Sequence, residues 1–123
     1  LALHSMIQHP VSVVKVLIGN SLDASASTVS VLIKDGGLKL IQVTDNGHGI
    51  RVEDLLHIKS MGFRGEALTL MSYFGHVTVT TIFKGQLHGY RVSYRDGVME
   101  DEPMPCAAVG GTQIMVEDLF YNM

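Results

Sequence analysis

The sequence is short of several residue types, and each shortage excludes a kind of protein. Cys106 is the only cysteine among 123 residues, so no internal disulfide can form, which fits a reducing compartment. Charged residues make up only 17% of the chain against 46% hydrophobic residues, a balance typical of a packed globular protein and not of a disordered one. No apolar run approaches the roughly 20 residues of a membrane-spanning helix. We therefore expect a soluble chain that folds as one domain over residues 1–123.

Basic residues are also few and scattered. The net charge is −3 at pH 7, and lysines and arginines occur as singles along the chain. Because nonspecific DNA affinity comes mainly from neutralised phosphates, the composition gives no support for autonomous DNA binding. The N-terminal residues lack the basic flank and long apolar core of a secretory signal. The sequence also lacks an initiator methionine, which suggests a fragment.

Two periodicities divide the sequence into helices and strands. After Pro10, which suits the first turn of a helix, apolar residues recur at intervals of three and four. From His76 onward they alternate with polar residues, as in a strand with one buried face. We expect helices over about 10–22, 51–59 and 66–71, and strands over 28–33, 38–43, 76–82, 90–94, 98–99 and 112–116.

Turn residues join these strands into hairpins. Glycines at 36–37, 85 and 97 mark turns between neighbouring strands, while Pro103 and Pro105 mark an irregular edge. Antiparallel hairpins with separated helices indicate an α+β fold. We expect a two-layer sandwich, with helices on one face of a mixed, mostly antiparallel sheet.

The segment Asp45-Asn46-Gly47-His48-Gly49 places a carboxylate at the end of a predicted strand. Two glycines let the backbone fold tightly around whatever the carboxylate holds. A buried aspartate accepts two donors at once, which suits an amino group beside a ring nitrogen or its bound water. However, Asn-Gly after an alternating apolar run is also the strongest short signal for a type I′ hairpin turn. The segment alone leaves both interpretations open.

Three further segments have a functional and a structural interpretation. Asn20, at the end of the first helix, could coordinate Mg²⁺ through its side-chain oxygen, or it could stabilise the helix end. Gly62-Phe63-Arg64-Gly65-Glu66-Ala67-Leu68 opens a helix, where free N–H groups favour a phosphate, or it is a loop that needs positive φ angles. Thr112 could contact the same ring as Asp45, or it is an ordinary strand start.

Read in order, the four segments resemble the four nucleotide-binding motifs of the gyrase, Hsp90, histidine kinase and MutL ATPase superfamily, whose ATP-binding architecture is the Bergerat fold. The resemblance is closest to the MutL branch of DNA mismatch-repair proteins, for which Gly-Phe-Arg-Gly-Glu-Ala-Leu at 62–68 is highly specific. The stretches 37–42, 111–114 and 116–122 look like eukaryotic MutL homologue one. The match covers nearly the whole chain from about Met6, with one internal gap.

The resemblance implies roles for residues of all four segments. Asp45 would bind the adenine amino group, with Gly47 and Gly49 closing under the base. Asn20 would hold Mg²⁺ against the triphosphate, and Thr112 would support the adenine end through hydroxyl or water contacts. The backbone amides of the third segment would wrap the phosphates of ATP, from Arg64, Gly65, Glu66, Ala67 and Leu68.

The chain departs from this family in three places. The family's general base is a glutamate four residues before the motif asparagine, and here that position is Val16, which cannot accept a proton. The segment at 50–62 is shorter than in the family, so part of the lid, with a Thr-Ser-Lys element, is absent. The residues before Met6 differ from the family, and the chain stops at Met123, before the family's second domain and dimerisation region. We therefore expect a truncated, incomplete nucleotide-binding domain.

The resemblance implies that the chain binds Mg-ATP to drive dimer closure, with weakened hydrolysis. It also implies a second MutL-family subunit and a mismatch-sensor protein as partners in the nucleus, with DNA reached only through the assembly and no membrane. Three alternatives stay open: a competent ATPase with another carboxylate as base, of which Glu53 is the nearest in sequence; a nonenzymatic nucleotide-binding or interaction module that partners an intact MutL subunit; and a decayed fragment without function. His48 and the other histidines lack metal-ligand spacing, and so does Cys106, so we assign them no metal.

Overall fold

The computed structural model describes residues 9–57, 63–108 and 110–122. The helices are α2 (Pro10–Asp23), the 3₁₀ turn η1 (Asp35–Gly37), α3 (Val52–Leu56) and α4 (Phe63–Phe74). The strands are β1 (Val29–Lys34), β2 (Leu40–Asp45), β3 (His76–Ile82), β4 (Gly89–Arg95), β5 (Val98–Met99), β6 (Met104–Cys106) and β7 (Gly111–Glu117). Over these ranges, the helices are too short or too polar to span a membrane.

The strands form one sheet in the order β1-β2-β7-β3-β4-β5, and β6 pairs with β4 away from this path. All pairings between the described strands are antiparallel. The last strand, β7, inserts between β2 and β3, so residues far apart in the sequence become neighbours. In this register Thr112 of β7 lies opposite Asp45 of β2 on one side and opposite Thr81 of β3 on the other.

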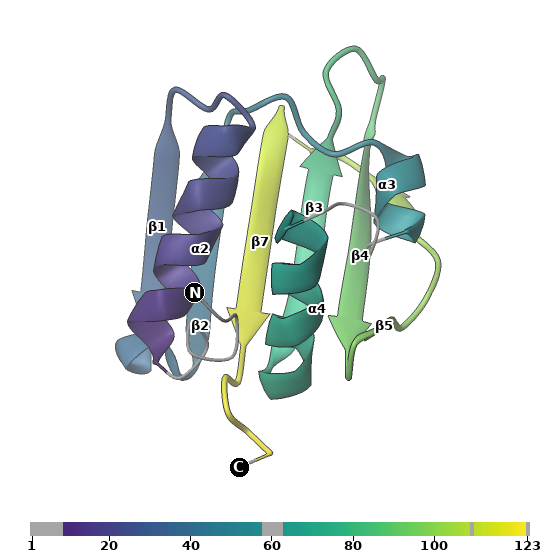
Figure 1. Cartoon of the computed structure of the whole chain (residues 1–123). Coiled ribbons are helices and arrows are strands. Elements are labelled where there is room, and N and C mark those ends of the chain that lie inside the picture. The colour runs from purple at the N-terminus through teal and green to yellow at the C-terminus, as the bar shows by residue number, and fades with distance from the viewer. Residues whose placement is uncertain (1–8, 58–62, 109, 123) are drawn as a thin grey trace.

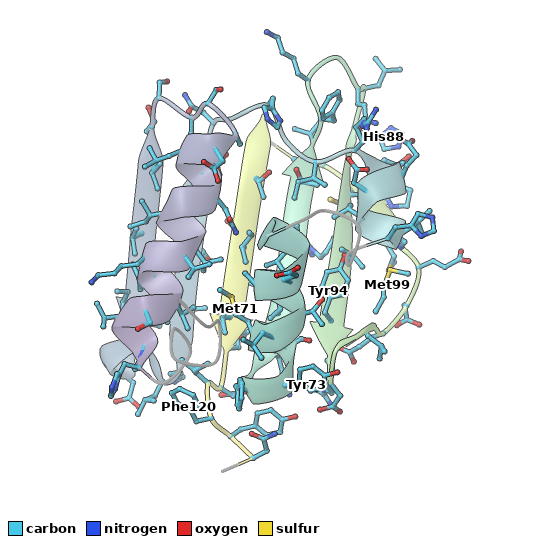
Figure 2. All side chains as sticks on the ribbon, viewed as in Figure 1. Met71, Tyr73, His88, Tyr94, Met99 and Phe120 are labelled. Atoms are coloured by element: carbon cyan, nitrogen blue, oxygen red, sulfur yellow. The ribbon has the colours of Figure 1, made fainter. Side chains whose placement is uncertain are left out.

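The helices lie on one face of the sheet (Figure 1), with α2 over β1 and β2 and α4 over β3, beside β4. The core fills the space between these two layers. It contains the alternating buried residues of the central strands and the inner faces of α2 and α4. Met71 of α4 and Tyr94 of β4 lie on this helix side of the sheet (Figure 2). The predicted α+β sandwich of helices on a mostly antiparallel sheet is confirmed.

The predicted hairpins and the first helix are confirmed, while several boundaries differ. The strand expected over 38–43 is β2, which runs from Leu40 to Asp45. It begins two residues later than expected because the N–H of Leu38 still closes the preceding turn by donating to Asp35 O at 3.0 Å. Asp45 is therefore the last residue of a strand. The helix expected from Glu66 already begins at Phe63. The edge expected to be irregular contains β6, since a proline is tolerated where its nitrogen need not donate to a neighbouring strand.

Candidate functional site

Asp45 ends β2 on the helix side of the sheet. It continues the alternation of buried residues along β2 and is 9% exposed. Its Oδ1 accepts the N–H of Gly47 at 2.8 Å. Its Oδ2 has no hydrogen-bond partner among the described residues. A carboxylate oxygen that is sheltered and unpaired is an acceptor for a donor group that enters from outside the chain.

The two glycines after Asp45 let the loop fit between the end of α2 and the end of β3. A Cβ on Gly47 would lie 2.6 Å from the carbonyl oxygen of Ala24. A Cβ on Gly49 would collide with the carbonyl of Ile82, and Gly49 has a φ of 80°. The N–H of His48 donates to Ala24 O at 3.1 Å and fixes the loop against α2. The glycines are therefore required by close packing.

The alternative of a type I′ hairpin turn at Asn46-Gly47 is wrong. Positive φ occurs at Gly49, outside this dipeptide, and β2 pairs with β1 and β7 instead of with β3, the next strand along the chain. The side chain of Asn46 has another task. Its Oδ1 accepts the N–H groups of Ser27 and Thr28, each at 2.9 Å, and so ties the loop to the start of β1.

Hydroxyl groups lie beside Asp45 on the neighbouring strands. Thr112, directly across from Asp45, is buried, and its Oγ1 lies 2.8 Å from Oγ1 of Thr81. The Thr81 hydroxyl also donates to Gly111 O at 3.1 Å and accepts the N–H of Ile50 at 2.9 Å. The Asp45 loop, β3 and β7 are thus joined by one buried polar cluster.

Asn20 lies on the inner face of α2, one turn before Ala24. Its side chain is buried, and Nδ2 has no hydrogen-bond partner among the described residues. The end of α2 is closed by the backbone, since the N–H of Ala24 donates to Asn20 O at 3.1 Å. The side chain of Asn20 is therefore not needed to stabilise the helix end, and its amide is an unpaired polar group in a buried place.

The Asn20 amide fits a magnesium ion only when other ligands are supplied. The described residues contain no cluster of three or more His, Cys, Asp or Glu side chains that could hold a metal. Mg²⁺ is commonly bound through one or two protein oxygens together with phosphate oxygens and water. With the amide turned so that Oδ1 faces the ion, Asn20 suits this arrangement.

The third predicted segment lies in the first turns of α4. The N–H groups of the N-cap and of the first three helical residues have no partner within a helix, which leaves those of Arg64 and Gly65 available for an anion, whereas the N–H of Glu66 bonds within α4. The N–H groups of Ala67 and Leu68 bond within the helix, and their side chains are buried in the core. Of Arg64 the structure describes the backbone only.

Val16 faces the core and is 5% exposed. The position that would carry the general base is therefore occupied by an apolar side chain in an apolar environment. The carboxylate suggested as a replacement, Glu53, is exposed on α3. Part of the shortened lid segment, 58–62, lies outside the described residues.

The sequence interpretation missed two features of the site. The alternation along β3 puts Thr81 on the buried face of the strand, but only the pairing of β3 with β7 shows that it contacts Thr112. A cavity of about 640 Å³ is lined in part by the loop after Asp45, with Ala24, Gly47 and Lys84 in its wall. Its wall combines the end of α2 with the turn between β3 and β4, which local sequence patterns cannot place together.

Residues 8–69, half of the chain, match the family described as histidine kinase-, DNA gyrase B-, and HSP90-like ATPase. The chain belongs to this ATPase family. Within it the chain resembles MutL proteins, as expected from the segment at 62–68. It is 40% identical to the putative MutL protein homolog 1 of Schizosaccharomyces pombe and 41% identical to the DNA mismatch repair protein MLH1 of Saccharomyces cerevisiae, in both over 100% of this chain.

The chain spans only 22% and 18% of the lengths of these two relatives. The alignment with the Schizosaccharomyces pombe protein runs over 148 positions against the 123 residues of this chain. The relative therefore has residues without a counterpart here.

The chain is also similar to solved structures of ATPase domains. The Aquifex aeolicus MutL ATPase domain complexed with ADP is 34% identical, with a TM-score of 0.81, over 95% of this chain and 45% of that one. The 43K ATPase domain of Thermus thermophilus gyrase B, in complex with an aminocoumarin, is 17% identical with a TM-score of 0.67, over 90% of this chain and 35% of that one. This second likeness shows the fold alone.

Proposed function

We propose that this chain is a nucleotide-binding domain of a MutL-type mismatch-repair protein, and that it binds Mg-ATP with the base at Asp45. The observation that carries the proposal is the arrangement at the end of β2. There Asp45 Oδ2 has no hydrogen-bond partner within the part of the chain that the structure describes, and the hydroxyl of Thr112 lies on the adjacent strand. The family match supports ATP as the nucleotide.

Each group of the site has a distinct task in this proposal. Asp45 accepts a hydrogen bond from the adenine amino group, while Gly47 and Gly49 let the loop lie close to the base. Asn20 contributes one oxygen to Mg²⁺, which neutralises charge on the phosphates when bound. The free N–H groups at the start of α4, with the positive end of its helix dipole, hold phosphate oxygens.

Hydrolysis is expected to be weak, because the position of the family's general base carries the apolar side chain of Val16. Val16 offers no acceptor for the proton of the attacking water, and a general base contributes about 10²–10⁴-fold in rate. We therefore favour a domain that acts by binding the nucleotide and not by hydrolysing it. By analogy with MutL proteins, binding would drive closure onto a second MutL-family subunit in the nucleus, with a mismatch sensor and DNA reached through that assembly.

Asp45→Asn is the sharpest variant for testing this proposal, because it has the shape of the wild-type side chain. Its amide oxygen can still accept the Gly47 N–H, while its NH₂ group would face the adenine amino group donor to donor. A hydrogen bond to a charged group contributes about 1.5–3 kcal/mol. We expect the Kd for a nonhydrolysable ATP analogue, measured by calorimetry with Mg²⁺, to rise about 10- to 150-fold.

Thr44→Val is the matched control, since Thr44 is the preceding residue of β2 on the opposite face, where it hydrogen-bonds to Gln113. It should bind like the wild type. Omitting Mg²⁺ should raise the Kd of the wild type for the ATP analogue. The Kd of Asn20→Ala should be the same with and without Mg²⁺. If the wild type gives no binding heat, or if Asp45→Asn binds as tightly as the wild type, the proposal is wrong.

The rival of a competent ATPase is tested by turnover of Mg-ATP. Robust hydrolysis by the wild type that is abolished in Glu53→Gln would support that rival. ATP binding without turnover would support our proposal instead.

A further inference from the structure

We propose that Thr81 is a positioning residue for base recognition, and that it makes the site prefer an amino group over a keto oxygen on the bound purine. This inference rests on the proposed function, because it concerns the same nucleotide. It is carried by the hydrogen bonds of the Thr81 hydroxyl, whose residue is 1% exposed.

The Thr81 hydroxyl has one proton and three neighbours. The N–H of Ile50 can only donate to it, at 2.9 Å. The carbonyl of Gly111 can only accept from it, at 3.1 Å. The contact with the third neighbour, the hydroxyl of Thr112 at 2.8 Å, allows either oxygen to donate. We assign the single Thr81 proton to Gly111 O, and in this assignment Thr112 donates to Thr81.

This fixed direction leaves Thr112 as an acceptor toward the site. Its proton points to Thr81, so its lone pairs stay available to a donor in the space beside Asp45, its direct cross-strand neighbour. Asp45, when ionised, is also an acceptor only. The base edge therefore meets two acceptors and no donor from these side chains.

Two acceptors select a base edge that carries donors. The exocyclic amino group of adenine has two N–H donors. Hypoxanthine carries a keto oxygen in that place, and its neighbouring ring N–H could still satisfy Asp45. Rejection of the keto base therefore depends on the lone pair of Thr112, which would oppose the keto oxygen as long as Thr81 holds the proton away.

The experiment compares the wild type with Thr81→Val, which keeps the size of the side chain and removes the hydroxyl. Without Thr81 Oγ1 the Thr112 proton is free to turn and donate to a keto oxygen. We measure Kd for ATP, for inosine triphosphate and for inorganic tripolyphosphate, which has no base. The ratio of the inosine triphosphate Kd to the ATP Kd should fall about tenfold, the effect of one hydrogen bond.

Thr81→Ser keeps the hydroxyl and should retain the wild-type ratio. Thr78→Val is the matched control, because Thr78 lies on the same strand, on the opposite face, and hydrogen-bonds to Ser93. It should change no affinity. Tripolyphosphate should bind alike to all variants, since the phosphate end of the site is distant from the change in the base pocket. Should Thr81→Val fail to fold, Thr81→Cys, whose thiol is a weak acceptor, should give an intermediate ratio.

If Thr81 had a structural role alone, Thr81→Val would weaken the binding of ATP and of inosine triphosphate equally. The ratio of their Kd values would then stay unchanged, and that result would overturn the assignment. A fall of this ratio in Thr81→Ser would overturn it as well. Failure of the wild type to bind ATP would overturn the proposed function and this inference with it, whereas normal ATP binding with an unchanged ratio would reject Thr81 alone.

Discussion

Val16→Glu returns a carboxylate to the position of the family's general base and tests whether that position lies in a dry core. Val16 is 5% exposed and belongs to the main hydrophobic cluster. Losing a buried valine costs about 1.5–3 kcal/mol, and burying an unpaired polar group costs about 1–3 kcal/mol more. We expect the free energy of unfolding at pH 8 to fall by about 3–5 kcal/mol, a large part of a typical domain's stability.

The pH dependence of this loss has a definite sign. Burial raises the pKa of the introduced carboxyl above its unfolded value of about 4.3. The folded state then keeps a proton that the unfolded chain releases, so the stability of Val16→Glu falls as the pH rises from about 4 through the folded-state pKa. Val16→Gln has a similar size and polarity but cannot ionise, and it should show no added pH dependence.

Urea unfolding followed by circular dichroism at pH 5 and pH 8 measures both effects. Lys15→Glu is the surface control, because Lys15 is exposed on the adjacent position of α2, and it should change stability little. A buried carboxyl held neutral cannot act as a base, so we expect no gain in Mg-ATP hydrolysis of the order of 10²-fold. Wild-type stability of Val16→Glu at pH 8, or a gain in hydrolysis of that size, would show that position 16 does not lie in a dry core.

Two further substitutions test the elements around the site. Gly49→Ala places a Cβ against the Ile82 carbonyl at a φ of 80°. We therefore expect the free energy of unfolding, measured by a thermal melt, to fall by more than about 2 kcal/mol. Wild-type stability would show that the loop is not closely packed. Tyr94 donates to Leu55 O at 2.9 Å, and burial raises the pKa of its phenol. Since the unfolded tyrosine ionises near pH 10, the Tm should fall as the pH rises above about 10. Tyr94→Phe should lose this extra alkaline sensitivity, and an unchanged alkaline profile would contradict the assignment.

The fold was largely predictable because its elements have strong local signals. Pro10 and the apolar spacing after it predicted α2, and the change to alternating residues at His76 predicted β3. The glycine turns predicted the hairpins. These signals depend on neighbours within a few residues, which is why they can be read directly from the sequence.

The site was predictable only in part, because its decisive contacts are nonlocal. Asn46-Gly47 carries a local turn signal, yet contacts with Ser27 and the end of α2 determine its conformation. The importance of Thr81 depends on a pairing with β7, whose residues lie some thirty positions later in the chain. The register of distant strands is set by the packing of the whole sheet and not by any one segment.

Binding of the ATP base by the loop after β2 can be followed residue by residue in an NMR titration of the ¹⁵N-labelled chain with a nonhydrolysable ATP analogue and Mg²⁺. We expect saturable shifts of the amide signals of Gly47, Gly49 and Thr112, with the same binding curve for each. Absence of shifts, or saturable shifts confined to Lys84 and Gln86, which also line the 640 Å³ cavity, would show that the base does not bind at Asp45.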